Sequence, residues 1–321
     1  MKKRLIMLMV LGLAVFLSGC SSQSGSLEEM VKETKTVMDM KGEVVIPANP
    51  QRIVDVSGSA DELIIMGVPF IASANTSMFD GVTVPEYLRS YFMDNKVEVV
   101  GNYSGTMDLN LEKIAELKPD LIIMNIRHEK VYEQLKAIAP TLMLSDDLNF
   151  VDWRGRFRQL GQWFGKEEVV AQWLKDFDAR AAEMTQKVKE VAGEETFAVI
   201  EANSVHFGSY YIYRTAGPGG LLFDELKLTP SAGVPEKVWG EVVDAEYFSR
   251  IDADHIFFFS DDGRLGDTGN SPAWQNLQAV QKGNVYYGVN EEQYDMAYTP
   301  KGKLLYMEKM AEAIINHTDV K

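Results

Sequence analysis

Short apolar runs separated by helix-like stretches recur along the chain. Runs over residues 52–56, 121–124, 196–202 and 254–259 have the length of buried β-strands, and segments with helical spacing lie among them. Strands that alternate with helices predict parallel sheets of the α/β class. The other predicted elements are a hairpin at 37–46, strands at 68–73, 97–100, 141–144, 210–213 and 284–288, and helices at 111–117, 131–138, 221–226, 246–251, 274–280 and 300–315. Residues 57–62 are expected to form a loop that caps a further helix running to about Met66.

The longest helical signal lies near the middle of the chain. Apolar side chains recur there every three or four residues and form one stripe: Val170, Trp173, Phe177, Ala181, Met184, Val188 and Val191. Lys166-Glu167-Glu168 starts the predicted helix, and Gly193 is a typical C-terminal stop. About 26 residues at 1.5 Å each span about 39 Å, which is long enough to connect two lobes.

The two halves of the sequence contain a similar segment. Glu112 precedes Asp120 by the same spacing that separates Glu246 from Asp254, and in both cases the Glu opens a short predicted helix and the Asp precedes a buried strand. Together with the long helix, this repeat predicts two Rossmann-like α/β lobes bridged by a single helix, with a ligand cleft between the lobes. The expected boundaries are 34–160 for the first lobe, 161–193 for the connecting helix and 194–321 for the second lobe.

The N-terminus has the pattern of an export signal. Three basic residues precede an apolar run over residues 5–17, and the small residues Ser18 and Gly19 precede Cys20, the only cysteine. The run is too short to span a membrane. We expect residues 1–19 to be removed as a signal peptide and Cys20 to carry a lipid, and residues 20–33, which begin Ser/Gly-rich, to form a tether. The expected location is the outer face of a cell membrane.

Charge and composition exclude some classes of partner. The net charge of −15 disfavours nucleic acid, whose phosphates require a basic surface, and it disfavours docking on anionic lipid. Strong acidity is also a common route to solubility. The apolar fraction of 46% is ordinary for a globular protein.

No catalytic constellation is evident in the sequence. The chain lacks a Gly-x-Ser-x-Gly elbow, and the Gly-rich segment 216–220 lacks the Lys and Ser/Thr of a phosphate loop. The four histidines are too scattered to predict a metal site. His255 lies in a predicted buried strand and is expected to be structural. Arg127 and His128, in contrast, follow the end of a predicted strand, where α/β lobes place ligand contacts.

The order of several short motifs resembles one known class of protein. The motifs are residues 45–54 (VIPANPQRIV), residues 62–68 (ELIIMGV), Leu111-Glu112 with residues 117–122 (LKPDLI), and residues 239–246 (WGEVVDAE). In this order they resemble the substrate-binding lipoproteins of ABC importers for iron–siderophores and cobalamin, in which one rigid helix joins two α/β lobes. The resemblance covers nearly the whole chain after the signal.

The resemblance implies roles for particular residues. Glu112 and Glu246 correspond to the lobe-tip carboxylates that pair with arginines on the two permease subunits, and two similar acids would suit a two-fold partner. The alternative is that they are surface acids favoured by helix dipoles. The expected cleft residues are Tyr103, Asn125, Arg127, His128, Tyr213, Arg214, Trp239 and Tyr294, although the aromatic ones could instead belong to the core.

The expected ligand is a ferric siderophore, delivered to a permease dimer with its ATPase by a monomeric receptor. Because the iron of such a ligand is already chelated, the protein needs no metal ligands or cofactor of its own. One or two cleft arginines suit a neutral tris-hydroxamate better than a trianionic tris-catecholate. Another iron chelate, haem and cobalamin remain alternatives, and an exported α/β hydrolase is a remote one.

Overall fold

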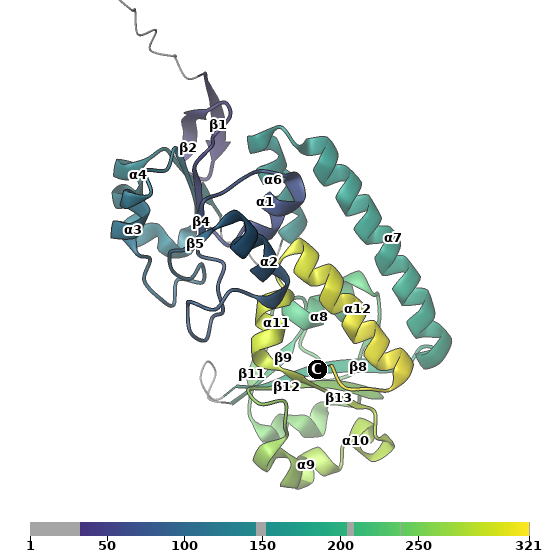
Figure 1. Ribbon diagram of the computed structural model, residues 1–321. Coiled ribbons are helices and arrows are strands. Elements are labelled where there is room, and N and C mark those ends of the chain that lie inside the picture. The colour runs from purple at the N-terminus through teal and green to yellow at the C-terminus, as the bar shows by residue number, and fades with distance from the viewer. Residues whose placement is uncertain (1–32, 146–151, 204–208, 238, 321) are drawn as a thin grey trace, which may run out of the picture. The chain divides into compact units, whose positions relative to one another are not determined.

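Two β-sheets and a long helix organise the chain, as a computed structural model shows (Figure 1). The structure describes residues 33–145, 152–203, 209–237 and 239–320. The predicted signal, Cys20, nearly all of the tether, and His206 lie outside these residues.

The first element is an antiparallel hairpin of β1 (Thr34–Asp39) and β2 (Gly42–Pro47), as predicted. The Asp39 carboxylate accepts hydrogen bonds from the backbone N–H groups of Lys41 and Gly42, which closes the turn.

The N-terminal lobe is built on a five-stranded sheet in which every pair is parallel. The strand order is β5-β4-β3-β6-β7, so the order reverses between β3 and β6. The elements of this lobe are β3 (Ile53–Val56), α1 (Ala60–Met66), β4 (Ala72–Ser73), α2 (Glu86–Asn95), β5 (Glu98–Val99), α3 (Leu111–Glu116), β6 (Leu121–Asn125), η1 (Ile126–Val131), α4 (Tyr132–Ile138) and β7 (Thr141–Leu144).

Two helices connect the lobes. Helix α6 (Trp153–Phe164) ends at Gly165, whose left-handed backbone stops the helix, and α7 (Glu167–Ala192) follows. Helix α7 has 26 residues, and the predicted stripe lies on its buried side, except that Trp173 is only partly buried and Val191 is exposed. The connecting helix was predicted to begin at residue 161, but residues 161–164 belong to α6 because Gly165 separates the two helices.

The C-terminal lobe is built on a mixed sheet. Strands β8, β12 and β13 are parallel, whereas β9 pairs antiparallel with both β8 and β11. A short connection between β8 and β9 permits only an antiparallel pair. The elements are β8 (Thr196–Asn203), β9 (Ser209–Tyr213), α8 (Gly217–Gly220), η2 (Leu221–Glu225), β10 (Thr229–Pro230), β11 (Gly240–Val243), η3 (Ala245–Arg250), β12 (His255–Ser260), η4 (Gly266–Asn270), α9 (Pro272–Gln275), α10 (Gln278–Lys282), β13 (Val285–Val289), α11 (Asn290–Met296) and α12 (Pro300–Asn316).

One apolar core is shared by both lobes. Side chains from one face of each sheet belong to it, for example Ile123 of β6 and Phe257 of β12, and α7 and α12 add Phe177 and Met310. The opposite face of each sheet has its own smaller core, with Met124 in the first lobe and Phe258 in the second. We call the first of these three the shared core. Each sheet is therefore covered on both faces, as expected of an α/β lobe.

The structure confirms the internal repeat that the sequence indicated. In the first lobe the Asp120 carboxylate accepts hydrogen bonds from the backbone N–H groups of Gln51 and Arg52, just before β3. In the second lobe Asp254 accepts one from the backbone N–H of Thr196, the first residue of β8. Each Asp thus joins the start of one central strand to the start of its parallel neighbour.

Several predicted elements differ from the structure. The strand predicted at 68–73 is only β4, and the helices predicted at 221–226 and 246–251 are a π-helical turn and a 3₁₀ turn. Helices α2 and α11 were not predicted. His255 is structural, as expected, because its ring stacks on Phe197 and hydrogen bonds to Tyr286 and Glu195.

Candidate functional site

Four tyrosines from the C-terminal lobe form a cluster that we call the tyrosine wall: Tyr211, Tyr213, Tyr294 and Tyr298. The rings of Tyr211 and Tyr213, both on β9, are 4.8 Å apart, and Tyr294 stacks on Tyr298 with 6.3 Å between centroids. Tyr213 and Tyr294 are buried, whereas Tyr211 and Tyr298 are half-buried. Burial raises the pKa of Tyr211 to about 12, so the wall is neutral and aromatic near pH 7.

A glycine makes the close packing behind this wall possible. Gly217, which begins α8, has a φ of +47°, and a Cβ added there would lie 2.7 Å from the Tyr298 hydroxyl. No other residue fits such a site without moving the ring. The Gly-rich segment 216–220 therefore acts as a backbone support for the tyrosine wall.

Aromatic side chains of the N-terminal lobe meet the tyrosine wall. Phe79 contacts Tyr294 edge-to-face, with ring centroids 6.0 Å apart. Tyr103 is 6% exposed, and burial raises its pKa to about 12. Burial also raises the pKa of Tyr298, and the neighbouring charge of Glu201 and the Tyr103 phenol add to this. The structure thus brings predicted Tyr103, Tyr213 and Tyr294 into one interlobe aromatic region. Phe79 and Tyr298 were missed because their loops carry no periodic pattern, and Tyr211 was missed because nothing in the predicted strand at 210–213 marked it as a site residue.

A cavity of about 870 Å³ opens beside this region, between the lobes. Two arginines and five acids line it: Arg89, Arg264, Glu86, Asp262, Glu291, Glu292 and Asp295. Burial, and then repulsion from Glu291, raises the pKa of the Asp295 carboxyl to about 7. None of the eight predicted cleft residues lines this cavity. Asp295 is adjacent to the predicted Tyr294, but no sequence signal marked Arg89 or Arg264.

The residues after β6 have different environments. Asn125 is fully buried: its amide nitrogen donates to the carbonyls of Ser57 and Tyr103, and its oxygen accepts from the backbone N–H of Arg127. His128 is 6% exposed, and its Nε2 lies 2.9 Å from the carbonyl of Asn102. Burial lowers the pKa of His128. Arg127 is exposed. Of Asn125, Arg127 and His128, Arg127 is therefore the one that solvent reaches. The Asn125 side chain fixes the backbone at Arg127 through its hydrogen bond.

Arg214 and Trp239 lie side by side at the ends of β9 and β11. The backbone N–H of Arg214 donates to the carbonyl of Trp239. Arg214 is half-buried, lies 3.8 Å from the Asp224 carboxylate and stacks over Phe223. Trp239 is 37% exposed. Ligand contact by these residues stays a prediction.

The two predicted docking acids lie at equivalent positions of the repeat. Glu112 is in the first turn of α3, and Glu246 is in the first turn of η3. Both are exposed. The N-cap side chains Asn110 and Asp244 accept hydrogen bonds from the backbone three residues on, which fixes the start of each turn.

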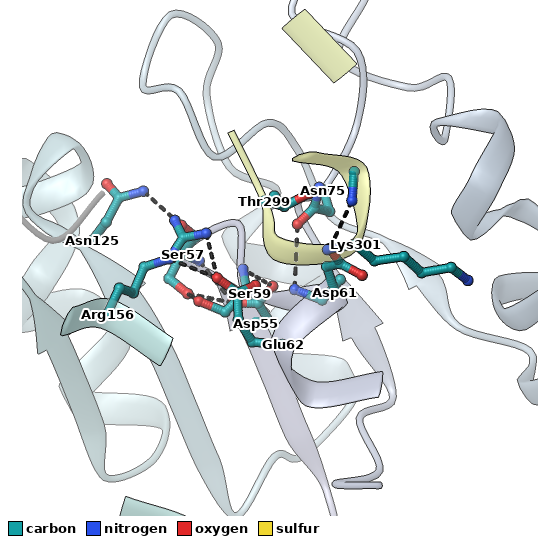
Figure 2. A network of polar contacts seen from close by, with 12 residues as sticks. Asp55, Ser57, Ser59, Asp61, Glu62, Asn75, Asn125, Arg156, Thr299 and Lys301 are labelled. Atoms are coloured by element: carbon teal, nitrogen blue, oxygen red, sulfur yellow. Dashed lines mark hydrogen bonds and ion pairs between the residues drawn. The ribbon is translucent and has the colours of Figure 1, made fainter. Parts of the chain in front are cut away.

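Helix α1 makes polar contacts with the C-terminal lobe, and Figure 2 shows Asp61 beside Lys301 at the start of α12. The Asp61 carboxylate, on α1, accepts hydrogen bonds from the backbone N–H groups of Lys301 at 2.6 Å and Gly302 at 3.3 Å. A carboxylate at a helix N-terminus is favoured by the helix dipole, so Asp61 caps α12 from the other lobe. Tyr87 and Thr299 are also joined by a 2.7 Å hydrogen bond between hydroxyls.

A buried ion pair lies beside that cap. The Arg156 side chain, on α6, donates to the Glu62 carboxylate on α1, with Nε 2.7 Å from the nearer oxygen. Both side chains are at most 2% exposed. Burial raises the pKa of Glu62 to about 7, although the charge of Arg156 opposes this. The ion pair links the first lobe to the connecting helices.

Two kinds of feature are missing from the part of the chain that the structure describes. It contains no group of three or more His, Cys, Asp or Glu side chains arranged to hold a metal ion. Its helices include none that is both long enough and apolar enough to cross a membrane.

Comparison with known proteins places the chain in a family. A periplasmic binding protein family model matches residues 84–291. The probable siderophore-binding lipoprotein YfiY of Bacillus subtilis is 31% identical over 94% of both chains, and the iron(3+)-hydroxamate-binding protein YxeB of the same species is 29% identical over 89% of both. The crystal structure of the petrobactin-binding protein YclQ from B. subtilis has a TM-score of 0.68 and 25% identity, over 89% of this chain and 98% of that one. The chain therefore belongs to the periplasmic binding protein family, and it is a two-lobed binding protein rather than an enzyme.

Proposed function

We propose that this protein is an ABC importer receptor that captures a ferric siderophore, with a hydroxamate complex as the favoured ligand. Supporting this, relatives with 29–31% identity are named as siderophore or iron(3+)-hydroxamate binders. The interlobe aromatic region offers flat apolar surfaces for the carrier, and Arg89 and Arg264 offer N–H donors for chelating oxygens.

The preference for a hydroxamate ligand rests on the charge of the interlobe cavity. Five acids and two arginines line the cavity, and burial first and the neighbouring acids second raise the pKa of Asp295. A negative potential of this kind repels a trianionic ferric tris-catecholate or an anionic citrate complex. A neutral or singly cationic ferric hydroxamate meets no such repulsion.

Binding of a ferric hydroxamate should quench the intrinsic fluorescence of the protein. The reason is that Trp239 and the tyrosine wall would lie close to a coloured iron complex. We expect saturable quenching with a Kd of about 1 µM or below, or about −8 kcal/mol. The measurement is a fluorescence titration with ferric hydroxamate, repeated with ferric catecholate, ferric citrate, haem and cobalamin.

Two controls sharpen this titration. The iron-free hydroxamate should quench less than its ferric complex, and Trp239→Phe should reduce the amplitude of quenching more than Trp274→Phe, because Trp274 is buried in the core of the second lobe. Absence of quenching with all five ligands would rule out the proposed function. Preference for catecholate over hydroxamate would overturn only the choice of ligand.

The membrane anchor and the permease belong to the same proposal. A lipid on Cys20 would hold the receptor at the outer face of the membrane, and the residues up to 33 would give it slack for capture and docking. Glu112 and Glu246 would then contact the two permease subunits. Relatives named as lipoproteins support the anchor, and the positions of the two acids in the repeat support the docking role.

A further inference from the structure

A fully buried carboxylate, Glu201, lies behind the tyrosine wall. It is on β8, where side chains alternate between the two faces of the sheet. Phe197 and Val199 precede it on the same face, and both belong to the shared core. Glu201 therefore occupies a position that the strand pattern assigns to an apolar side chain, and a charge there is tolerated only with hydrogen-bond partners.

Hydroxyl and amide donors surround this carboxylate. One oxygen of Glu201 accepts a hydrogen bond from the Tyr294 hydroxyl at 2.9 Å. The other accepts from the Tyr213 hydroxyl and from Nε2 of Gln293, the latter at 3.1 Å. The same nitrogen of Gln293 lies 3.1 Å from the Tyr213 hydroxyl oxygen. Donors from β9 and α11 thus converge on one buried group.

This arrangement decides what the two tyrosines can offer a ligand. A phenol has one hydroxyl proton, and in Tyr213 and Tyr294 that proton points at Glu201. Burial, together with the neighbouring charge of Glu201, also raises the pKa of both phenols above the ordinary value. Ionising either phenol would place a second negative charge beside the first. The two residues are thereby kept as neutral aromatic groups.

We propose that Glu201 is a positioning residue that fixes Tyr213 and Tyr294 as neutral aromatic groups of the interlobe aromatic region, and so favours iron complexes that need no phenolate from the protein. Ligands that require a phenolate from the protein, such as haem or a ferric ion with an open position, would be rejected. The ligand class in this inference rests on the proposed function. The hydrogen bonds of Glu201, on which the positioning role is argued, do not depend on that ligand.

The first test needs no ligand. We expect alkaline titration of Glu201→Gln, followed by tyrosinate absorbance, to show phenols ionising at least about one pH unit lower than in the wild type. Adding Tyr213→Phe and Tyr294→Phe should remove the shifted groups. Glu225→Gln is the matched control, because Glu225 is also buried but accepts hydrogen bonds from Trp153 and Arg154. Identical titrations of Glu201→Gln and wild type would overturn the proposal.

The second test uses ligands. Glu201→Gln should weaken binding of a ferric hydroxamate about tenfold. It should cause no further loss in the Tyr213→Phe/Tyr294→Phe background, because Glu201 acts through those two hydroxyls. An equal loss in both backgrounds would contradict the proposal. With ferric nitrilotriacetate as a probe, the wild type should show no phenolate-to-iron charge-transfer band, and such a band would also overturn it.

These outcomes separate the two proposals. If the wild type binds no ferric hydroxamate, the proposed function fails, while the alkaline titration still decides the role of Glu201. Should Glu201→Gln not fold, as judged by circular dichroism, the single variants Tyr213→Phe and Tyr294→Phe replace it. Each should leave the titration of the folded protein unchanged, and loss of a titrating group in either would overturn the proposal.

Discussion

A variant with Glu112→Lys and Glu246→Lys should bind its ligand as the wild type does and yet fail to support uptake. Both side chains are exposed and lie at equivalent turns of the two lobes, and neither lines the interlobe cavity. Charge reversal would set two lysines against basic groups on the permease, and each lost pair in a docked interface costs about 2–5 kcal/mol. The measurements are uptake of radioactive iron into cells and a fluorescence titration of the purified variant.

A matched variant controls for the change in net charge. Glu133 and Glu168 are also exposed acids in the first turns of helices, on α4 and α7, and they have no repeat equivalence. Reversing both to lysine should leave uptake near the wild-type rate. If that variant fails equally, or if the Glu112/Glu246 variant loses ligand binding in parallel with uptake, the docking role is refuted.

The second large effect concerns stability. Glu62→Ala should lower the free energy of unfolding by about 3–5 kcal/mol, because it removes the buried carboxylate to which the buried Arg156 guanidinium donates. Chemical denaturation monitored by circular dichroism measures this. Glu98→Ala, which breaks an exposed pair with Lys113, should cost less than about 1 kcal/mol. A Glu62→Leu/Arg156→Met variant should recover most of the lost stability, and failure to recover would mean that more than an unpaired charge is involved.

The same pair predicts a pH dependence. The folded-state pKa of Glu62, about 7, is raised above its ordinary value of 4.5, so the folded protein binds the extra proton between these values. The contribution of Glu62 to stability is therefore fully present below about pH 4.5 and lost as the pH rises through about 7. Glu62→Gln should flatten this part of the stability profile. An unchanged slope in the variant would show that other groups produce it.

The fold was predictable where a local pattern determines it. The hairpin turn at Gly42, the stripe along α7 and the spacing from Glu to Asp in each half are readable from the sequence, and the structure contains all three. Strand β4 was overestimated because an apolar stretch extends beyond the two residues that pair. Helix α11 was missed because five of its seven residues are polar or charged.

The site was less predictable, because its residues are joined by tertiary contacts. Tyr103, Tyr213 and Tyr294 could be named from their positions after strands and from the resemblance. Glu201 could not, since a single acid in a strand usually faces solvent, and only the structure shows two tyrosines donating to it. Arg89 and Arg264 are separated by most of the chain and meet only at the interlobe cavity.

The shared core has a consequence for the history of the molecule. The repeated arrangement of Asp120 and Asp254 is the mark expected of a duplicated α/β unit. Yet the shared core contains residues of both sheets together with α7 and α12, so the two units no longer have separate interiors. Asp61 reinforces this, because a residue of one unit now completes the last helix of the other. Because both sheets bury one face in the same core, neither half of the chain alone would supply every surface that covers its own apolar face.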